Sequence, residues 1–521
     1  MSKSSLMALL LCVLGMLCGI MGTAAATDFS NVGLGITETG AMVNAIIPGP
    51  TTGQLYVGGS FTQVNGTGTG AITANNIALW DGAAWNALAE GLDGQVNAIA
   101  VIGRFVYVGG AFQNTLGPNP IPVNHLAVWN SLANQWFAVN KASGPTGGGV
   151  NGTVYSLNAA NAQYPDPANP GSFLTTTQLI VGGSFMQVAG SSNGFNTGYG
   201  NLAIYNPAVD PLTFTAFQGG VDATVTCGSV LGTNDLVNGG SFTMAGGIIQ
   251  NGVATSDVGN FVPTITFGHP VGAIAYDSAG NIYVGGSFTL TQSYFTPTPV
   301  TNPPTTPVTV TGNSYGMGVL LNGTNSWGGL SGGVSHTIPT ASPGTVDAIF
   351  FSDLNTSEPI VGGSFDQAGT AGQGAGVVGA ANLVQWNPSA TAWEPYIGGT
   401  DGPVLAIGQD SYHSIYVGGS FVTATSNITT ITSAIVRVGP NQDTGITGTA
   451  SASATATSST TATGASASSS ATGTGTTSTA TAGSTGAVAV PSSSGSSGCG
   501  LGSSMGVMLI LAMLLAWKRL R

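Results

Sequence analysis

Short apolar runs that end in paired glycines are the dominant pattern along this chain. The phrase Val-Gly-Gly-Ser-Phe, or a close variant, occurs seven times, at spacings of 46 to 77 residues. A phrase that recurs at such a period indicates a repeat array in which each copy is one supersecondary unit. The paired glycines are Gly58 and Gly59, Gly109 and Gly110, Gly182 and Gly183, Gly239 and Gly240, Gly285 and Gly286, Gly362 and Gly363, and Gly418 and Gly419.

Each glycine pair follows an apolar or aromatic residue, as Tyr56-Val57 precedes the first pair. Glycine inside a strand is entropically unfavourable and usually marks a bulge or a close approach of another backbone. We therefore expect each pair to lie in a crowded place where neighbouring repeats meet and no Cβ fits. The Phe that follows is large and apolar, and it is suited to fill the space between repeats.

Three further strands accompany each glycine phrase. Upstream lies an alternating run such as 43–46 (Val-Asn-Ala-Ile), which predicts a strand. Downstream lies a run such as 77–80, followed by an aromatic residue that marks a fourth strand. These markers are Trp85, Trp136, Phe214, Phe261, Trp327 and Trp393. Four short strands in each of seven repeats predict an all-β fold, a single seven-bladed β-propeller.

The seventh repeat lacks an aromatic-marked fourth strand, because low-complexity sequence follows residues 433–438. Residues 29–35 precede the first Val-Asn-Ala-Ile run, in the place that a fourth strand would occupy. We therefore predict that residues 29–35 pair beside 433–438 as the outer strand of the last blade. Closure by an N-terminal strand would remove two sheet edges at once.

The repeat resembles a known class. A strand that ends in Gly-Gly, followed further on by an aromatic residue and a Trp, resembles the kelch repeat. The fuller form, Tyr-Val-Gly-Gly-Ser-Phe with Trp-Asp-Gly-Ala-Ala-Trp at 80–85, is more similar to the extracellular repeats of the fungal cortical polarity-marker (Rax-type) family. That family is usually longer and has several propellers. The resemblance covers roughly residues 28–440 and implies a propeller outside the cell with a role in polarity marking.

Composition divides the chain into five segments. Residues 1–26 combine Lys3, an apolar run and Ala24-Ala25-Ala26, which is typical of a secretory signal peptide. An uncleaved signal-anchor is the alternative. Residues 27–443 hold the propeller repeats. Residues 444–499 are almost wholly Ser, Thr, Ala and Gly, which predicts a disordered stalk.

Residues 500–517 are apolar and precede a basic tail, 518–521. The order predicts a short membrane anchor with its basic end in the cytoplasm, and hence a single-pass protein of the cell surface. A signal for a GPI anchor and a bacterial surface-sorting tag are the alternatives. Each of the three places the propeller at a surface.

Charged residues make up only 5% of the chain, and its nineteen acids all lie between Asp28 and Asp443. In that span the basic residues are Arg104, Lys141 and Arg437. Nucleic acid as a partner is therefore excluded, since its recognition needs basic side chains against phosphate. Cys12 and Cys18 lie in the signal segment, so the mature chain keeps Cys227 and Cys499. No disulfide framework is expected, and Cys227 is interpreted as an inert core thiol.

Two surface features are expected to decorate the repeats. Insertions at 159–177 and 296–311 are predicted to be surface loops, where binding is often located. Idle loops are the alternative. Asn-x-Ser/Thr tripeptides make the protein a candidate glycoprotein, with acceptors at Asn65, Asn151, Asn322, Asn355 and Asn427.

The sequence shows no pattern typical of catalysis, of metal binding or of a cofactor site. His125, His269, His336 and His413 fall in different repeats and lack metal-ligand spacing. Asp-Gly at Asp81, Asp93 and Asp401 is typical of turns. We therefore predict no catalytic residue, no metal site and no cofactor.

The sequence is compatible with two functions. The first is a non-catalytic surface protein that binds a protein or glycan ligand for recognition, adhesion or cell-polarity marking. The alternative is a secreted or surface-anchored hydrolase or oxidase, with several acids, His or Tyr converging at the channel mouth.

Overall fold

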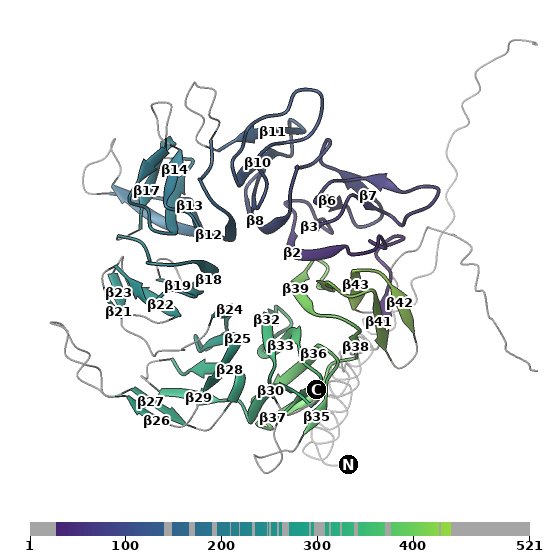
Figure 1. Cartoon of the computed structure of the whole chain (residues 1–521), viewed down its shortest axis with the longest axis vertical. Helices are drawn as coiled ribbons and strands as arrows, with labels where there is room; N and C mark the ends of the chain where they lie inside the picture. Colours follow the sequence, from purple (N-terminus) through teal and green to yellow (C-terminus); the bar gives the residue numbers. More distant parts are fainter. Residues whose placement is uncertain are drawn as a thin grey trace, which may run out of the picture. The chain divides into compact units, whose positions relative to one another are not determined.

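The computed structural model describes residues 28–438 apart from short gaps, and every regular element in that range is a β-strand (Figure 1). The gaps are at 140–147, 166–171, 190–194, 209, 218, 232–234, 247, 250–251, 258–259, 263–269, 291–292, 296–307, 312–313, 323–325, 338–341, 370–376 and 427–428. Among the described residues, no helix has the length and apolar character needed to cross a membrane.

Some sequence predictions concern residues outside this range. The chain divides into two units, Met1–Thr447 and Gly448–Arg521, and all described residues belong to the first. The predictions that lie outside the described residues are the signal segment 1–26, the stalk 444–499, the anchor 500–517, the tail 518–521, Cys12, Cys18, Lys141, His269, Asn427 and Cys499.

Each of the first six repeats forms four antiparallel strands in the order of the chain. The first four repeats comprise β2 (Met42–Pro48), β3 (Leu55–Ser60), β6 (Ile77–Trp80) and β7 (Trp85–Ala87); β8 (Val96–Ile102), β9 (Phe105–Gly110), β10 (Leu126–Asn130) and β11 (Gln135–Ala138); β12 (Val154–Pro165), β13 (Phe173–Gly183), β16 (Leu202–Asn206) and β17 (Asp210–Ala216); and β18 (Val225–Leu231), β19 (Asp235–Gly240), β22 (Val253–Asp257) and β23 (Asn260–Val262). The fifth and sixth comprise β24 (Val271–Tyr276), β25 (Ile282–Leu290), β28 (Ser314–Leu320) and β29 (Ser326–Gly329), and β32 (Thr345–Ser352), β33 (Asn355–Ser364), β36 (Leu383–Asn387) and β37 (Ala392–Pro395).

The seventh repeat takes its fourth strand from the other end of the chain. Its sheet has the order β1 (Phe29–Ser30), β43 (Ile435–Val438), β40 (Ile415–Gly419) and β39 (Val404–Gln409). β1 pairs antiparallel with β43, with Phe29 opposite Val438. The pairing expected for residues 29–35 is thus observed over two residues only. Residue Ile36 continues the contact differently, since its carbonyl accepts a hydrogen bond from the Ala434 amide at 2.8 Å.

The first strands of the repeats contact one another in sequence around a common centre (Figure 1). β2 packs against β8, β8 against β12, β12 against β18, β18 against β24, β24 against β32, and β32 against β39. The succession returns to its start, because β39 of the seventh repeat packs against β2 of the first. No described sheet closes on itself, and the first strands of neighbouring repeats pack together without pairing in a ladder. The fifth and sixth repeats are also joined by pairing, because the strand at Gly332–His336 pairs with β28 and with a short strand of the sixth repeat, Gln367–Ala368.

Short pairings between the second and third strands were not expected from the sequence. They involve β4 (Gln63–Val64) with β5 (Ile72–Thr73), β14 (Gln187–Ala189) with β15 (Phe195–Thr197), β20 (Met244–Ala245) with β21 (Ile248–Ile249), β26 (Ser293–Phe295) with β27 (Val308–Thr311), β34 (Gln367–Ala368) with β35 (Val378–Gly379), and β41 (Thr423–Ser426) with β42 (Thr430–Thr432). In five of these pairings the third residue after the repeat Phe is buried, as Val64 is. That apolar position was the sequence signal for the extra hairpin.

The insertion at 159–177 is not the surface loop that the sequence predicted. It lengthens the first hairpin of the third repeat, because β12 and β13 remain paired from Leu157 opposite Val181 out to Pro165 opposite Phe173. In the fifth repeat, the described end of the second insertion forms β27, which pairs in parallel with β29. Both insertions therefore extend sheets where they are described.

The two glycines of each phrase face different neighbours. A Cβ on the first glycine would come within 3.0 Å of the Val that begins the next repeat's first strand, as Gly58 does with Val96. Gly418 has the same relation to Val43 of the first repeat. A Cβ on the second glycine would instead meet a backbone carbonyl of its own sheet, as Gly59 meets Met42. The first glycine thus sets the approach of adjacent repeats, and the second the approach of paired strands.

The Phe of each phrase is buried in all seven repeats, with at most 2% of its surface exposed. It lies among apolar residues of its own repeat, as Phe61 lies with Val43, Leu55 and Val64. Because the glycines admit close backbone approach, these rings pack directly against aliphatic side chains. The core of each repeat is correspondingly aliphatic and aromatic.

Hydrogen bonds from a few side chains hold the connections between strands. Asn76, at φ 67°, donates through Nδ2 to the Leu92 carbonyl at 2.9 Å, and so ties the first repeat to the start of the second. Asn201 and Asn382 make the same tie to Val221 and Thr400. Asn tolerates this left-handed backbone better than most residues, which fits its recurrence there.

Candidate functional site

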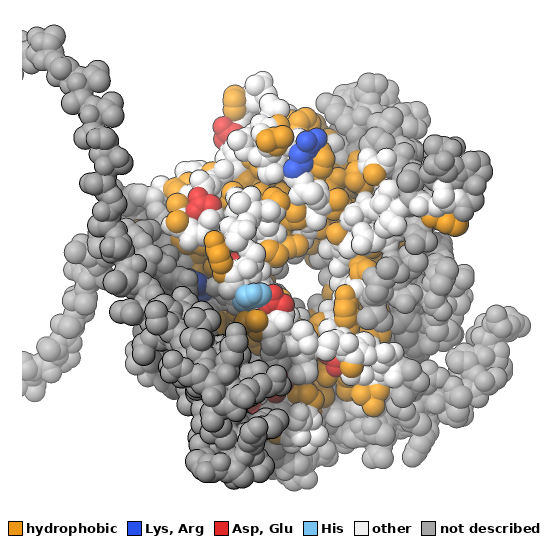
Figure 2. All heavy atoms as spheres, turned by 180° about the vertical axis from the view of Figure 1, so that it is seen from behind, with side chains coloured by type: hydrophobic (Ala, Val, Ile, Leu, Met, Phe, Trp, Pro, Cys, Tyr) orange, Lys and Arg blue, Asp and Glu red, His pale blue; other side chains and the backbone are white. Residues whose placement is uncertain are grey.

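A channel at the centre of the described residues is the candidate site. Its space is about 470 Å³, and it is lined by residues from β2, β8, β12, β18, β24, β32 and β39. Figure 2 shows the opening from the face opposite to Figure 1, with few charged side chains around it. A site on this channel would draw residues from every repeat.

Each of the seven inner strands carries a β-bulge at the same place in the repeat. The register between the first and second strands shifts between the first and third residues of the Val-x-Ala-Ile run, as between Val43 and Ala45. The bulged residue therefore lies on the channel wall rather than in the ladder. These residues are Asn44, Asn97, Tyr155, Thr226, Gly272, Asp347 and Leu405.

Three bulged residues link adjacent repeats by hydrogen bonds. Asn44 Nδ2 donates to the Val96 carbonyl at 2.9 Å, and Asn97 Nδ2 donates to the Val154 carbonyl at 3.0 Å. Thr226 Oγ1 donates to the corresponding carbonyl of Val271. The acceptor in each case belongs to the next repeat's first strand. Part of the polar lining is thus engaged in holding the ring of inner strands together.

Asp347 is the one carboxylate among the residues that line the channel. Burial raises its pKa to about 6, because the surrounding protein separates the charged form from water. The alternating run upstream of each glycine pair predicted a strand in every repeat, but it did not single out Asp347. Aligning the seven Val-x-Ala-Ile runs would have revealed it, since the second position is where polar residues gather.

Tyr155 and Cys227 bring further functional groups to the channel wall. The Tyr155 side chain is 39% exposed. Cys227 is a free thiol, whose pKa burial raises to about 12, and its Sγ donates to the Val271 carbonyl at 3.7 Å. The thiolate is the nucleophilic form of cysteine, so this thiol is inert near neutral pH.

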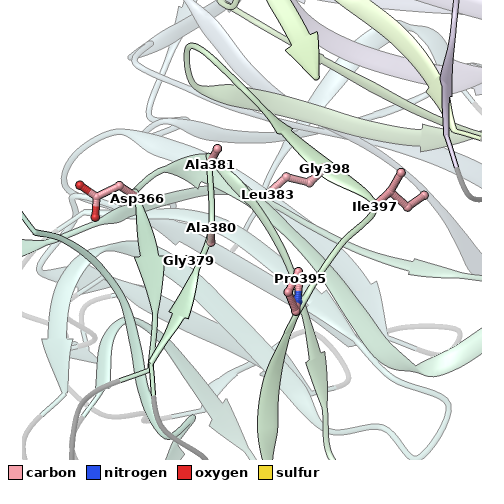
Figure 3. A pocket seen from close by; sticks show the side chains of 8 residues that line it. All are labelled: Asp366, Gly379, Ala380, Ala381, Leu383, Pro395, Ile397 and Gly398. Carbon is pink, nitrogen blue, oxygen red and sulfur yellow. The ribbon is translucent and has the colours of Figure 1, made fainter. Parts of the chain in front are cut away.

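A second cavity, also about 470 Å³, lies beside the sixth repeat (Figure 3). Its lining is mostly apolar or without side-chain polar atoms, and Asp366 points away from Pro395 and Ile397. The Asp366 carboxylate accepts hydrogen bonds from the Thr337 backbone amide and hydroxyl. Since its charged group is engaged elsewhere, this cavity offers little chemistry.

Acidic residues at the connections act as acceptors for loop backbone. Asp93 Oδ1 accepts from the Gln113 and Asn114 amides at 2.7 and 3.0 Å. Asp401 Oδ1 accepts from Val422 and Thr423 in the same way. Asp81 accepts from Ala83 and Ala84 within its own turn. The interpretation as turn chemistry is confirmed for Asp81, whereas Asp93 and Asp401 accept from a later loop of the chain instead.

The histidines that the structure describes lie in separate environments. His125 contacts the Gly110 carbonyl at 3.2 Å, and burial lowers its pKa. His413 lies on the surface, with Nδ1 at 2.7 Å from Asp353 Oδ2. His336 is in β30 (Gly332–His336), which pairs with β31 (Ser342–Pro343). Within the described ranges, no three His, Cys, Asp or Glu side chains gather as a metal site.

The four described glycosylation acceptors differ in accessibility. Asn151 and Asn322 are exposed, whereas Asn65 and Asn355 are half-buried. In each of them Nδ2, the atom that would carry a glycan, donates a hydrogen bond in the folded chain. The acceptors are the Gly70 carbonyl, Gln187 Oε1, the Ala279 carbonyl and Glu358 Oε2. Asn151 and Asn322 are therefore the more accessible candidates.

Comparison with known proteins gives likenesses among solved structures. No protein-family model matches the sequence, and no curated protein matches it. Among solved structures, the chain is similar to the extracellular domain of a protein assigned as a hybrid two-component system of B. thetaiotaomicron, with 12% sequence identity and a TM-score of 0.44. The match covers 79% of this chain and 40% of that chain, so this chain spans less than half the length of its neighbour.

Proposed function

We propose that this chain is a non-catalytic cell-surface protein that presents a seven-bladed β-propeller for recognition, adhesion or cell-polarity marking. The propeller would extend over residues 27–443, and the segment 444–499 would serve as a stalk. The segment 500–517 would anchor the stalk in a membrane. A protein or a glycan would be the ligand.

Support for the propeller comes from the arrangement of the inner strands. β39 packs against β2, so the succession of first strands returns to its beginning. Gly418 and Val43 repeat, between the seventh and first repeats, the contact that every other pair of neighbours makes. A closed ring of equivalent sheets is how a propeller protects its edges. The β1–β43 pairing agrees with closure by an N-terminal strand.

We choose a non-catalytic role because of the side chains that line the channel. The lining consists of amide, hydroxyl, sulfhydryl and aliphatic side chains, with Tyr155 and one carboxylate, Asp347. An active site for hydrolysis or oxidation usually brings together several titratable groups in mutual contact. Three of the polar bulged residues bind the neighbouring repeat instead.

The surface location rests on the sequence of the two ends, and one experiment tests it. Mass spectrometry of the native protein, recovered after labelling intact cells with an impermeant reagent, should find a mature N-terminus after Ala26. It should also find glycan on Asn151 or Asn322. An unlabelled chain that retains residues 1–26 would contradict the proposal. Recovery of peptides from 500–517 would separate a retained anchor from a processed one.

The resemblance to the Rax-type repeats is the reason for including polarity marking among the roles. Tyr-Val-Gly-Gly-Ser-Phe and the paired Trp80 and Trp85 carry that resemblance. A fluorescent fusion at its natural expression level should concentrate at sites of polarised growth. A fusion that is distributed uniformly over the cell surface would exclude polarity marking and would leave recognition or adhesion as the proposed role.

Asp347 favours one alternative, a hydrolase with its site at the channel. A carboxyl with a pKa of about 6 is suited to exchange protons near neutral pH. Assays of the purified chain against glycoside, ester and peptide substrates between pH 4 and 8 distinguish the two functions. We expect no turnover. Turnover that Asp347→Asn abolishes would establish the hydrolase.

A further inference from the structure

Asp347 differs from the acids at the connections because its carboxylate has no partner in the described structure. Asp93, Asp366 and Asp401 each accept hydrogen bonds from backbone amides of a loop. Asp347 lies on β32 and lines the channel, and no described residue makes a hydrogen bond or an ion pair with its side chain. A partly buried carboxylate without a partner is unfavourable. The Asp347 side chain is therefore available to a ligand.

Open space adjoins this carboxylate at Gly272 of the fifth repeat. A Cβ on Gly272 would lie 3.2 Å from the Val346 carbonyl oxygen and 3.8 Å from Asp347 Oδ1. Apart from the chain neighbours of Gly272, no other heavy atom of the described structure would lie within 4 Å of it. Gly272 and Asp347 both line the channel, so this space belongs to it. We call Gly272, Asp347 and the Val346 carbonyl the acceptor site.

The acceptor site lacks the donor that other repeats supply. Asn44, Asn97 and Thr226 occupy the position of the bulged residue in three other repeats, and each donates to the carbonyl of the Val that begins the next inner strand. Val346 is the corresponding Val of the sixth repeat, and Gly272 has no side chain that donates to it. A ligand that brings a donor replaces the missing group, and a positive charge on that donor pairs with the nearby carboxylate.

The charge of the channel and of the repeats favours a cation. No Lys or Arg is among the described residues that line the channel, and Asp347 is their one carboxylate. Residues 28–443 contain nineteen acids and three basic residues. A cleft lined by one sign of charge raises the local concentration of ligands of the opposite sign. An anion, in contrast, has no counter-charge at this site.

We propose that the acceptor site binds a primary alkylammonium group, carried either by a Lys side chain or by a free aliphatic amine. This inference rests on the proposed recognition function and names the chemistry of its ligand. An ammonium group has a positive charge and several N–H donors, so it can pair with Asp347 and donate to the Val346 carbonyl together. Ile274, Ile349 and Leu405 line the same channel, and such aliphatic surface suits the alkyl chain that carries the charge.

A divalent metal ion and a quaternary ammonium group fit this site less well. Calcium takes about six to eight oxygen ligands, whereas one carboxylate lines the channel within the described ranges. A quaternary ammonium group has no N–H and leaves the Val346 carbonyl without a donor. Its usual partners are several aromatic rings, and Tyr155 is the one aromatic residue among those described around the channel.

Binding is tested by isothermal titration calorimetry with the purified full-length chain in a non-ionic detergent. The probes are n-butylamine, cadaverine and a capped Gly-Lys-Gly peptide, with tetramethylammonium, calcium and sodium butyrate as comparisons. We expect a primary amine to bind about tenfold more tightly than any comparison, because hydrogen bonds to charged groups contribute on that order. Failure of every primary amine to bind, or tighter binding of calcium or tetramethylammonium, would overturn the inference.

The two sources of the ammonium group are distinguished in the same experiment. Tighter binding of the peptide than of the free amines would support the site and identify a Lys side chain of a protein partner as its ligand. Tighter binding of n-butylamine or cadaverine would support the site and identify a small amine.

Variants locate the binding. Asp347→Asn keeps the size of the side chain and removes its charge, and should weaken n-butylamine binding about tenfold. Gly272→Asn introduces the residue of the first two repeats, whose amide would occupy the space and donate to Val346, and should weaken binding without lowering Tm. Glu394→Gln removes a carboxylate from an exposed position on β37, the outer strand of the sixth repeat, and should bind as the unchanged chain does. Unaltered affinity in folded Asp347→Asn and Gly272→Asn would refute the site.

The pH dependence of the affinity is a readout that a purely structural role of Asp347 would not change. Burial raises the pKa of Asp347 to about 6, whereas an alkylammonium group keeps its proton up to about pH 10. Protons compete with the ligand below pH 6, so the affinity should fall about tenfold for each unit of pH there and be constant above pH 7. The strands packed against β32 and the channel lining hold these other titratable side chains: Tyr276, Tyr283, Tyr315, His336, Glu358, Tyr155 and Cys227. Asp347→Asn separates Asp347 from them, and an unchanged pH dependence in this variant would contradict the inference.

The outcome separates this inference from the proposed function. A chain that reaches the cell surface but binds no primary amine refutes the ligand class and leaves the surface role intact. A chain that binds an amine through Asp347 but lacks surface labelling refutes the surface role and supports the acceptor site.

Discussion

Glycine at the end of each second strand controls spacing at the scale of a single atom. The first glycine of a pair admits the Val of the next repeat, as Gly362 admits Val404. The second glycine lets the backbone of the paired strand come close, as Gly363 does for the Thr345 carbonyl. An added methyl group must displace packed atoms in either place, and packed interiors resist such displacement.

The first prediction follows from this spacing. Gly362→Ala should lower the free energy of unfolding by about 1–3 kcal/mol, because overpacking forces the Val404 side chain or its strand to move. Gly68→Ala is the matched control, since a Cβ there would meet nothing within 4 Å. Urea unfolding of both variants measures the difference. Equal stability of the two would show that the crowding does not limit the fold.

The acids at the connections give a second prediction, on pH. Burial opposes ionisation of Asp401, but hydrogen bonds from Thr423 and Val422 outweigh it and hold the pKa below its usual value of 3.8. The stabilisation is therefore complete above about pH 4, and is lost as the pH falls through the lower pKa of the folded state. Asp222 has a lowered pKa with the same pattern of partners.

Asp401→Asn should keep the loop and remove part of this pH dependence. Asn151 shows that an amide can serve, because its Oδ1 accepts from the Met186 and Gln187 amides at 3.0 and 2.9 Å. Thermal melts between pH 2 and 6 should fall less steeply for Asp401→Asn than for the unchanged chain. The reverse change, Asn151→Asp, should steepen the fall. If Tm depends on pH in the same way in the Asp401→Asn variant and in the unchanged chain, the Asp401 carboxylate does not cause the pH dependence.

At the scale of the element, a bulge in every inner strand turns one residue of each repeat toward the channel. The bulge frees that position from the core pattern, which explains why it holds residues as different as Asn97, Asp347 and Leu405. The adjoining Val and Ala stay buried, as Val96 and Ala98 do. Variation in the lining thus leaves the sheet intact.

A third prediction concerns the hydrogen bonds made at the bulges. Asn97→Leu should lower the free energy of unfolding by about 0.5–1.5 kcal/mol, since the Val154 carbonyl loses its donor. Leu is tolerated at the equivalent position, where Leu405 occurs naturally. The comparison variant is Leu405→Asn, for which we expect no loss. A greater loss for Leu405→Asn, measured in denaturant, would show that these hydrogen bonds do not stabilise the ring.

The alternating runs predicted the elements well, because alternation and paired glycines are local signals. All six aromatic markers, from Trp85 to Trp393, fall in fourth strands as expected. The bulges, the short hairpins and the lengthened β12–β13 hairpin were missed. Each depends on which residue faces which across strands, and register is fixed by long-range pairing rather than by composition.

At the scale of the whole described unit, both ends of the repeat array meet in one sheet. Phe29, Val32 and Ile36 are each at most 2% exposed. Val32 also accepts a hydrogen bond from Trp85 Nε1 at 2.9 Å, so the N-terminal segment contacts the first repeat as well as the seventh. It therefore joins the first and seventh repeats, in addition to the direct packing of β39 against β2.

The last prediction is that removing residues 28–36 lowers Tm of the entire unit. The deletion exposes the edge of β43, removes three buried apolar side chains and leaves the Trp85 indole without its acceptor. Unpaired edges and buried unsatisfied groups are both unfavourable, and the loss should propagate because β2 and β39 pack together beside the same seam.

Differential scanning calorimetry of two deletions tests it. Removing the chain from Thr444 onward is the control, and should leave Tm unchanged because the low-complexity sequence at 444–499 has too few apolar residues to add to a core. Ile36→Ala should lower the free energy of unfolding by about 2–5 kcal/mol, as expected for a fully buried aliphatic side chain. The N-terminal deletion should melt below both. If it melts at the temperature of the full chain, the seam is held by the contact of β39 with β2 alone, and the N-terminal strand is not part of the closure.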